Sequence, residues 1–159
     1  MMYRAFVFIF ISISVLLLAL GIHYLTDELD VSGQNLLVPP EPSIYINGVG
    51  IPFERGSYCW QENNQAVCAD TAGAKELMRE SAAFVVREGE FIWIDFDLQP
   101  STIDTTLFTS NQEQMIDMKE GQIKLPSDPG IYIIELFVRW EHKGDAMYAF
   151  KIKIPSDEL

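Results

Sequence analysis

Apolar and polar residues alternate over short runs through most of the chain after Ser43. Strand side chains point alternately to opposite faces of a sheet, so this pattern predicts half-buried β-strands. It is clearest between Phe91 and Leu98. In that run the inner face would carry Ile92, Ile94, Phe96 and Leu98, and the outer face Phe91, Trp93, Asp95 and Asp97.

The last part of the chain predicts two long strands joined at "HKGD" (142–145). In the first of them Tyr132 alternates with Ile134, Leu136, Val138 and Trp140 on the inner face, and the outer face carries Ile133, Glu135, Phe137 and Arg139. Turn signals at Asn47-Gly48, Glu88-Gly89 and Glu120-Gly121 separate shorter strands. Strands and turns at this density favour an antiparallel β-sandwich.

One segment, 70–80, has a helical pattern. Asp70 or Thr71 would cap it, and Leu77 and Met78 would form a small apolar face. The sequence therefore predicts an all-β domain with one short helix.

An apolar run without charge or proline extends from Ala5 to Ile22, and about 18 such residues can span a bilayer core. Arg4 precedes the run and acidic residues follow it between Asp27 and Asp30. The positive-inside rule then places the N-terminus in the cytoplasm and the rest outside. We expect a single-pass signal anchor at 1–24, a tether rich in polar residues and proline at 25–42, and the β domain at 43–155.

Two other interpretations of the N-terminus are a cleaved signal peptide and a lipoprotein signal. The run ends in "LALGIHYL", which lacks the small-residue pattern of a cleavage site. A lipoprotein signal needs a cysteine after the small residues, and Ile22 and His23 stand there instead. The sequence therefore favours an uncleaved transmembrane helix in the cell membrane.

The part of the chain after the apolar run is strongly acidic. It holds ten of the eleven basic residues and all twenty-three acidic ones, a formal charge of −13. Such a charge disfavours nucleic acid and anionic lipid headgroups as partners. It is compatible with basic partners, with divalent cations or simply with solubility.

The chain has two cysteines, Cys59 and Cys68. Disulfides persist outside the cytoplasm, whereas a zinc site would need further ligands and a redox pair usually has C-x-x-C spacing. We expect a structural disulfide that closes a loop of about ten residues and stabilises the fold by about 2.5–3 kcal/mol.

Candidate catalytic groups are few, and the sequence predicts no metal site and no cofactor. His142 is the only histidine after the tether and would lie at a hairpin tip, where a histidine is usually solvated. Asp95 and Asp97 would share a strand face and could form an acid–base pair of a cell-envelope enzyme. Two carboxylates on a solvated strand face are the ordinary case, so this stays the alternative function.

The outer faces of the predicted strands carry an aromatic group. If the strands around Trp93 and Phe137 are neighbours, then Phe91, Trp93, Phe137 and Arg139 form one exposed patch. Exposed apolar patches often mark binding sites. The alternative is that the helix at 70–80 or the tether covers the patch.

The stretch "PGIYIIELFVRW", with Tyr132 following Pro129-Gly130, resembles a late strand of immunoglobulin-like domains, in which a tyrosine hydrogen-bonds back across the corner. Together with "GSYCW…CAD" and "GDAMYAFKI", it also resembles a group of small membrane-anchored or lipid-anchored extracytoplasmic proteins of Bacillus-type Gram-positive bacteria. The resemblance covers about residues 46–154. It implies an immunoglobulin-like β-sandwich outside the membrane, and it transfers no catalytic residues to this chain. The plain apolar anchor departs from the lipid-anchored members.

These observations lead to a first expectation of function. We expect a membrane-tethered extracytoplasmic binding module that recognises a protein or another envelope component. The patch of Phe91, Trp93, Phe137 and Arg139 would carry the binding.

Overall fold

The structure is a computed structural model that describes residues 37–156. The expected transmembrane helix at 1–24 and most of the expected tether lie outside the described residues. Within 37–156, no helix has the length and apolar character needed to cross a membrane.

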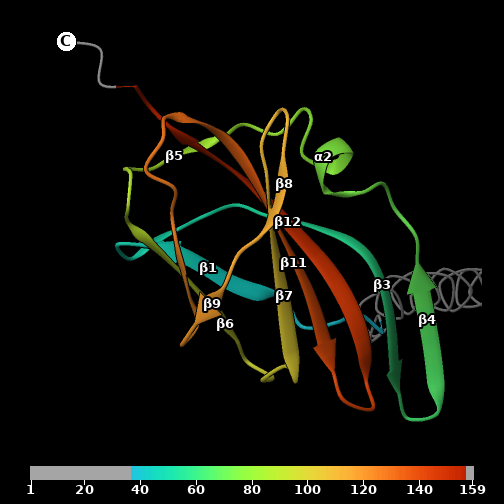
Figure 1. Cartoon of the computed structure of the whole chain (residues 1–159). Helices are drawn as coiled ribbons and strands as arrows, with labels where there is room; N and C mark the ends of the chain where they lie inside the picture. Colours follow the sequence, from blue (N-terminus) through green and yellow to red (C-terminus); the bar gives the residue numbers. More distant parts are fainter. Residues whose placement is uncertain (1–36, 157–159) are drawn as a thin grey trace, which may run out of the picture. The chain divides into compact units, whose positions relative to one another are not determined.

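The described chain consists almost entirely of strands (Figure 1). Its first strands are β1 (Pro42–Ile46), β2 (Val49–Gly50), β3 (Glu54–Glu62), β4 (Gln65–Ala69) and β5 (Phe84–Val85). Next come β6 (Phe91–Phe96), β7 (Thr102–Phe108), β8 (Glu113–Met115), β9 (Met118–Lys119) and β10 (Gln122–Lys124). The chain ends with the two longest strands, β11 (Gly130–Trp140) and β12 (Gly144–Ile154). One short helix, α2, spans Ala74–Leu77.

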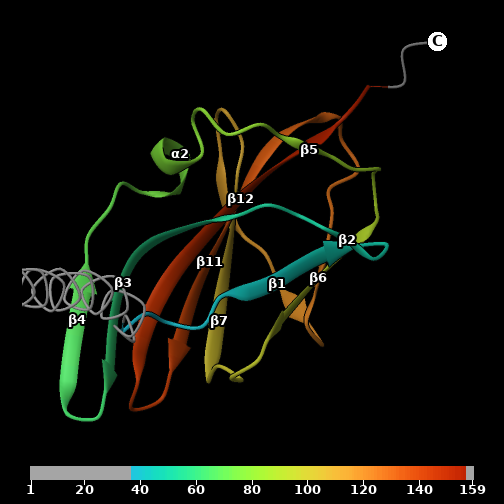
Figure 2. The same cartoon turned by 180° about the vertical axis from the view of Figure 1, so that it is seen from behind.

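The strands form two sheets, as the alternation predicted. The five-stranded sheet has the order β2-β1-β6-β10-β9. The seven-stranded sheet has the order β4-β3-β12-β11-β7-β8, and β5 adds to β12. All pairs are antiparallel except that of β5 with β12. Figure 2 shows the paired strands β1 and β6 on one side of the long strands β11 and β12.

One apolar core lies between the two sheets. The five-stranded sheet contributes alternate residues such as Ile44, Ile92 and Ile94, and the seven-stranded sheet contributes residues such as Leu136 and Phe150. All of these side chains are buried. The period-two pattern of the sequence is therefore the pattern of a two-layer, sandwich-like fold.

Three tight turns join neighbouring strands, and both central residues of each have positive φ. They are Asn47-Gly48 between β1 and β2, Asn63-Asn64 between β3 and β4, and Glu120-Gly121 between β9 and β10. Positive φ at both positions is the geometry of a type I′ hairpin turn, whose twist matches that of the flanking strands. The turn signals in the sequence are confirmed at the first and third of these positions.

A glycine is required where the β11–β12 hairpin begins its return strand. Gly144 has a φ of 137°, and a Cβ at this position would collide with the carbonyl oxygen of Cys59 on β3. The close approach lets β12 pair with β3 from its first residue, since Gly144 lies opposite Trp60.

Three buried polar side chains of the core bond to backbone carbonyls. The Tyr132 hydroxyl donates to the carbonyl of Asp128 at 2.8 Å, four residues earlier, which is the corner bond expected from the sequence. The Trp140 indole N–H donates to the carbonyl of Leu98 at 2.8 Å, and the Tyr148 hydroxyl donates to that of Pro40. These bonds remove the cost of burying the three polar groups.

The helix is shorter than the expected range of 70–80, and the expected cap is wrong. Its N-cap is Gly73, without a side-chain hydrogen bond. Asp70 and Thr71 bond instead to Ser57 on β3, whose hydroxyl donates to Asp70 Oδ1 at 3.1 Å and accepts from the Thr71 backbone N–H at 2.9 Å. These contacts hold the chain in an extended form until Gly73, so the helix starts later.

Candidate functional site

Phe91 and Trp93 lie on the outer face of β6, as predicted. Their exposed fractions are 48% and 41%, whereas Ile92, Ile94 and Phe96 between and beyond them are buried. Large exposed aromatic side chains on a strand are the exception in a folded domain, where such groups usually enter the core.

Tyr45 extends this aromatic group, and sequence reasoning missed it. It lies directly opposite Trp93 in the β1–β6 pair. The two ring planes are parallel within 4°, and their centroids are 6.4 Å apart. Tyr45 alternates with the buried Ile44 and Ile46, so its outward orientation could be read from the sequence, but its partner strand could not.

Polar residues of β10 and β9 continue the same face. Gln122 lies opposite Trp93 and Lys119 lies opposite Gln122, so a row of paired residues crosses four strands. Lys124 lies opposite Phe91, two pairs further along and on the same face. A groove of about 370 Å³ runs beside Phe91 and is lined by both lysines, by Gln122 and by two acids, Asp117 and Glu120. We call this surface the aromatic face: Tyr45, Phe91, Trp93, Lys119, Gln122 and Lys124.

Among the described elements, none packs on the aromatic face. The helix α2 contacts β3, β11 and β12, all of which belong to the other sheet. Figure 1 shows α2 on the side of β12, away from β1 and β6. The five-stranded sheet thus buries its inner face and leaves its outer face uncovered within 37–156.

Phe137 and Arg139 do not join this surface, and the expectation of one patch with Phe91 and Trp93 is wrong. They lie on β11, which pairs with β7 and β12 in the seven-stranded sheet. β6 pairs with β1 and β10 in the five-stranded sheet. The two outer faces point away from the shared core in opposite directions, so side chains on them cannot meet.

The outer face around Phe137 is covered by α2, as the alternative interpretation held. Ala74 and Met78 form a buried cluster with Met147 and Ala149 of β12, and Phe137 packs against this cluster. The Lys151 ammonium secures the end of the helical segment by donating to the carbonyls of Arg79 at 3.0 Å and Ser81 at 2.8 Å.

Arg139 contacts two residues of its own sheet. Its guanidinium lies 3.1 Å from Asp104 Oδ2 on β7 and 4.7 Å from the centre of the Phe137 ring. Both partners are its neighbours within the seven-stranded sheet. The side chain is half exposed, so the ion pair contributes little to stability.

Glu135 is the carboxyl on this covered face whose titration is perturbed. Burial raises the pKa of Glu135, and the charge of Glu113 adds to the rise, while a hydrogen bond from the Ala74 backbone lowers it. Perturbed carboxyls occur at functional sites and also under packed structural elements. The position beneath α2 fits the second case.

Asp95 and Asp97 do not share a strand face. Asp95 is on the outer face of β6, where its Oδ1 accepts from the Gln99 amide at 3.2 Å. β6 ends at Phe96, so the alternation that would align Asp97 with Asp95 stops before it. The same ending explains why Leu98, expected in the core, is 44% exposed.

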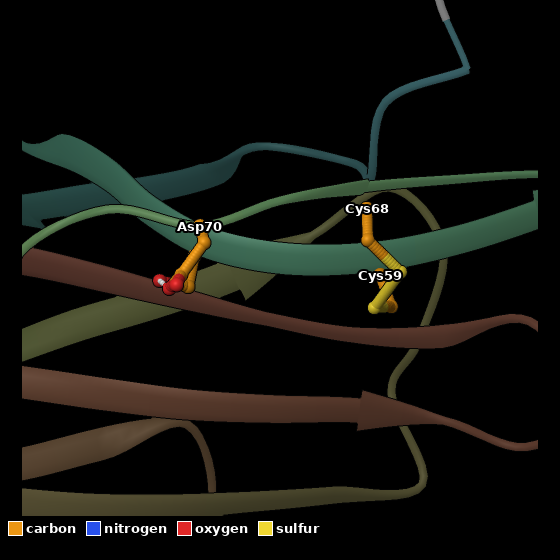
Figure 3. The surroundings of a disulfide bond; sticks show 4 residues. Cys59, Cys68 and Asp70 are labelled. Atoms are coloured by element: carbon orange, nitrogen blue, oxygen red, sulfur yellow. Dashed lines mark hydrogen bonds between the residues drawn. A yellow bond between two sulfur atoms is a disulfide. The ribbon is translucent and has the colours of Figure 1, made fainter.

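The expected disulfide between Cys59 and Cys68 is present (Figure 3). The two residues lie directly opposite each other in the β3–β4 pair, with Cα atoms 4.1 Å apart. Both are exposed. The disulfide therefore cross-links an edge hairpin, β3–β4. The hydrogen bond between Ser57 and Asp70 joins the two strands of the same hairpin at its base.

No metal centre emerges within residues 37–156, where no group of three or more His, Cys, Asp or Glu side chains is placed to hold an ion. His142 lies in the β11–β12 turn with its side chain 89% exposed. Its Nε2 is 3.4 Å from a carboxylate oxygen of Glu141, an adjacent residue in the same turn.

Comparison with known proteins supplies no family. No protein-family model matches the chain, and no curated protein matches it.

Proposed function

We propose that the chain is a membrane-tethered extracytoplasmic binding module that recognises a protein of the cell envelope through the aromatic face. The anchor at 1–24 spans the cell membrane once, with the N-terminus in the cytoplasm. The tether at 25–42 then presents the β domain outside. The observation that carries the proposal is the pair of exposed rings of Phe91 and Trp93, with the half-buried Tyr45 stacked beside Trp93, on an uncovered sheet.

The order of the strands supports an immunoglobulin-like fold. The run β1-β6-β10-β9 in one sheet corresponds to strands A-B-E-D of such domains, and β8-β7-β11-β12 in the other corresponds to C′-C-F-G. The bond from the Tyr132 hydroxyl to the Asp128 carbonyl corresponds to the tyrosine corner at the start of strand F. The segment from β2 to β5 is then an insertion between strands A and B. Domains with this architecture commonly serve in recognition, so the fold is compatible with binding and does not select a partner.

The location outside the cytoplasm is supported by two independent features. Arg4 and the acidic residues flank the apolar run with the asymmetry of an anchor whose C-terminal side is outside. The exposed Cys59–Cys68 disulfide is of the kind that persists in an oxidising compartment. Both features agree with the resemblance to membrane-anchored proteins of Bacillus-type bacteria.

The composition of the aromatic face indicates the chemistry of the partner. Trp and Tyr are enriched among the residues that dominate binding energy at protein interfaces. Lys119 and Lys124 border the aromatic rings on one side. The fitting partner is a protein surface with an apolar centre and a carboxylate that pairs with Lys119 or Lys124, which share their groove with Asp117 and Glu120. Charge complementarity of this kind sets orientation and association rate more than affinity.

Site-specific cross-linking in native membranes tests the proposal. A photoreactive amino acid at Gln122, within the aromatic face, should capture one protein of the envelope. Trp93→Ala should abolish this capture, and Val67→Ala should preserve it. Val67 is the matched control because it is also 41% exposed but lies on β4 of the other sheet.

Two further measurements decide the outcome. The captured protein, once purified, should bind the full chain in reconstituted membranes more weakly as salt is raised, because the lysines contribute charge. The proposal is wrong if Trp93→Ala leaves the capture unchanged while the domain stays folded. It is also wrong if a photoreactive group on β4 captures the same protein and one at Gln122 does not.

A further inference from the structure

A second cavity lies on the other sheet, between the start of β11, the end of β7 and the start of α2. Its volume is about 590 Å³, and Lys75, Phe108, Gly130, Ile131, Tyr132 and Ile133 contribute to its walls. This volume falls within the range of small-molecule sites, which are mostly apolar with a few placed polar groups.

The walls of this cavity include two isoleucines of β11. Ile131 and Ile133 occupy outward positions, where the next outward residues are Glu135, Phe137 and Arg139. Ile133 reaches the edge of the cluster under α2, but Ile131 is 55% exposed. Packing under α2 accounts for Ile133 but not for the exposed Ile131, since solvent-facing strand positions usually carry polar residues.

Lys75 places one positive charge at this apolar surface. Its ammonium lies 5.2 Å from the centre of the Phe108 ring, so a cation–π contact holds it beside the cavity. No carboxylate within the described part of the chain forms an ion pair with it, which is equally true of Arg87, Lys119, Lys124, Lys151 and Lys153.

We infer that this cavity binds a single-chain amphiphile with an anionic head, such as a long-chain aliphatic carboxylate. The head would pair with the Lys75 ammonium, and the aliphatic chain would cover Ile131, Ile133 and the Phe108 ring. Ligand binding here removes apolar surface from water and gives Lys75 the counter-charge that the described chain does not provide. The site is separate from the aromatic face, which lies on the opposite sheet.

The test is photolabelling of the full chain in its membrane with a diazirine analogue of palmitate. Label is expected in the tryptic peptide 125–139, which contains both isoleucines. Unlabelled palmitate should compete with the label. Hexadecanol, which has the same chain and no charge, should compete about tenfold less well, as the loss of one charge-assisted hydrogen bond predicts.

Two pairs of variants separate the charge from the apolar wall. Lys75→Gln should reduce the labelling about tenfold, whereas Lys75→Arg should retain it. Ile131→Asp should abolish it, because a charged carboxylate would lie against the aliphatic chain. Val85→Asp is the matched control for the last change, since Val85 is 64% exposed on β5 and should label as the native chain does.

Three outcomes would overturn the inference. The first is the absence of competable label in peptide 125–139. The second is equal labelling of the Lys75→Gln and native chains. The third is labelling of a chain that ends at Ser156 but not of the full chain, because the segment 157–159, with the acids Asp157 and Glu158, would then be the occupant. None of these results bears on protein capture through Trp93, so the two proposals fail separately.

Discussion

Removal of a single hydroxyl from the centre of the core should both destabilise the domain and change its response to alkali. Tyr148 is fully buried, and its hydroxyl donates to the carbonyl of Pro40, just before β1. Tyr148→Phe keeps the ring and leaves that carbonyl without its donor. The expected loss in the free energy of unfolding at neutral pH is about 1–3 kcal/mol, the cost of an unsatisfied buried polar group.

The same hydroxyl should govern stability at high pH. Burial raises the pKa of Tyr148 above that of an exposed tyrosine, with a smaller opposing effect from Arg55. The folded state therefore retains a proton that the unfolded chain releases above about pH 10, so stability falls as the pH rises from there. Each such group contributes a slope of about 1.4 kcal/mol per pH unit until its own folded-state pKa is reached.

The assay is urea unfolding of the full chain in nanodiscs, followed by tryptophan fluorescence. All three tryptophans, Trp60, Trp93 and Trp140, lie in the described domain and report its unfolding. Tyr58→Phe is the control for the neutral-pH effect, since Tyr58 lies on β3 and is only partly buried. The alkaline slope of Tyr148→Phe should be reduced but not zero, because burial also raises the pKa of Tyr132. Equal stability of the two variants together with an unchanged alkaline slope would refute this reasoning.

Three other predictions concern the Cys59–Cys68 disulfide, the core and the orientation in the membrane. Non-reducing mass mapping should show Cys59 linked to Cys68, and replacing both with serine should lower stability by at most about 3 kcal/mol; free thiols in the native protein would contradict this. In thermal melts Leu136→Ala should cost about 2–5 kcal/mol, whereas Trp93→Ala should cost about 1 kcal/mol or less, and equal losses would make Trp93 a core residue. Protease added to intact protoplasts should degrade the domain from Ser43 onward, and protection until lysis would show that the orientation is reversed.

Local features of the fold could be read from the sequence because they depend on neighbouring residues. Alternation assigned the faces of β6 and β11, and the Asn47-Gly48 and Glu120-Gly121 pairs marked turns that need positive φ. The disulfide followed from the expected extracytoplasmic location and from the lack of further zinc ligands, and the structure places Cys59 and Cys68 opposite each other in one hairpin.

Long-range pairing could not be read in the same way. The outward positions of Trp93 and Phe137 were predicted correctly, but nothing in either strand states which strand lies beside it. Placing β6 and β11 in different sheets separated two residues that the sequence suggested were neighbours. The late start of α2 has a similar cause, since Ser57 lies on β3 and competes for Asp70 and Thr71 only once the chain has folded.

The lengths of the outermost strands have a consequence for solubility. β2 and β9, which end the five-stranded sheet, have two residues each, and β8 has three, so these edges offer little backbone for a second chain to extend. β4 is the longest edge among the described strands, with five residues. If reduction of the Cys59–Cys68 disulfide frees this hairpin, domains crowded on one membrane should aggregate by edge-to-edge pairing that starts at β4.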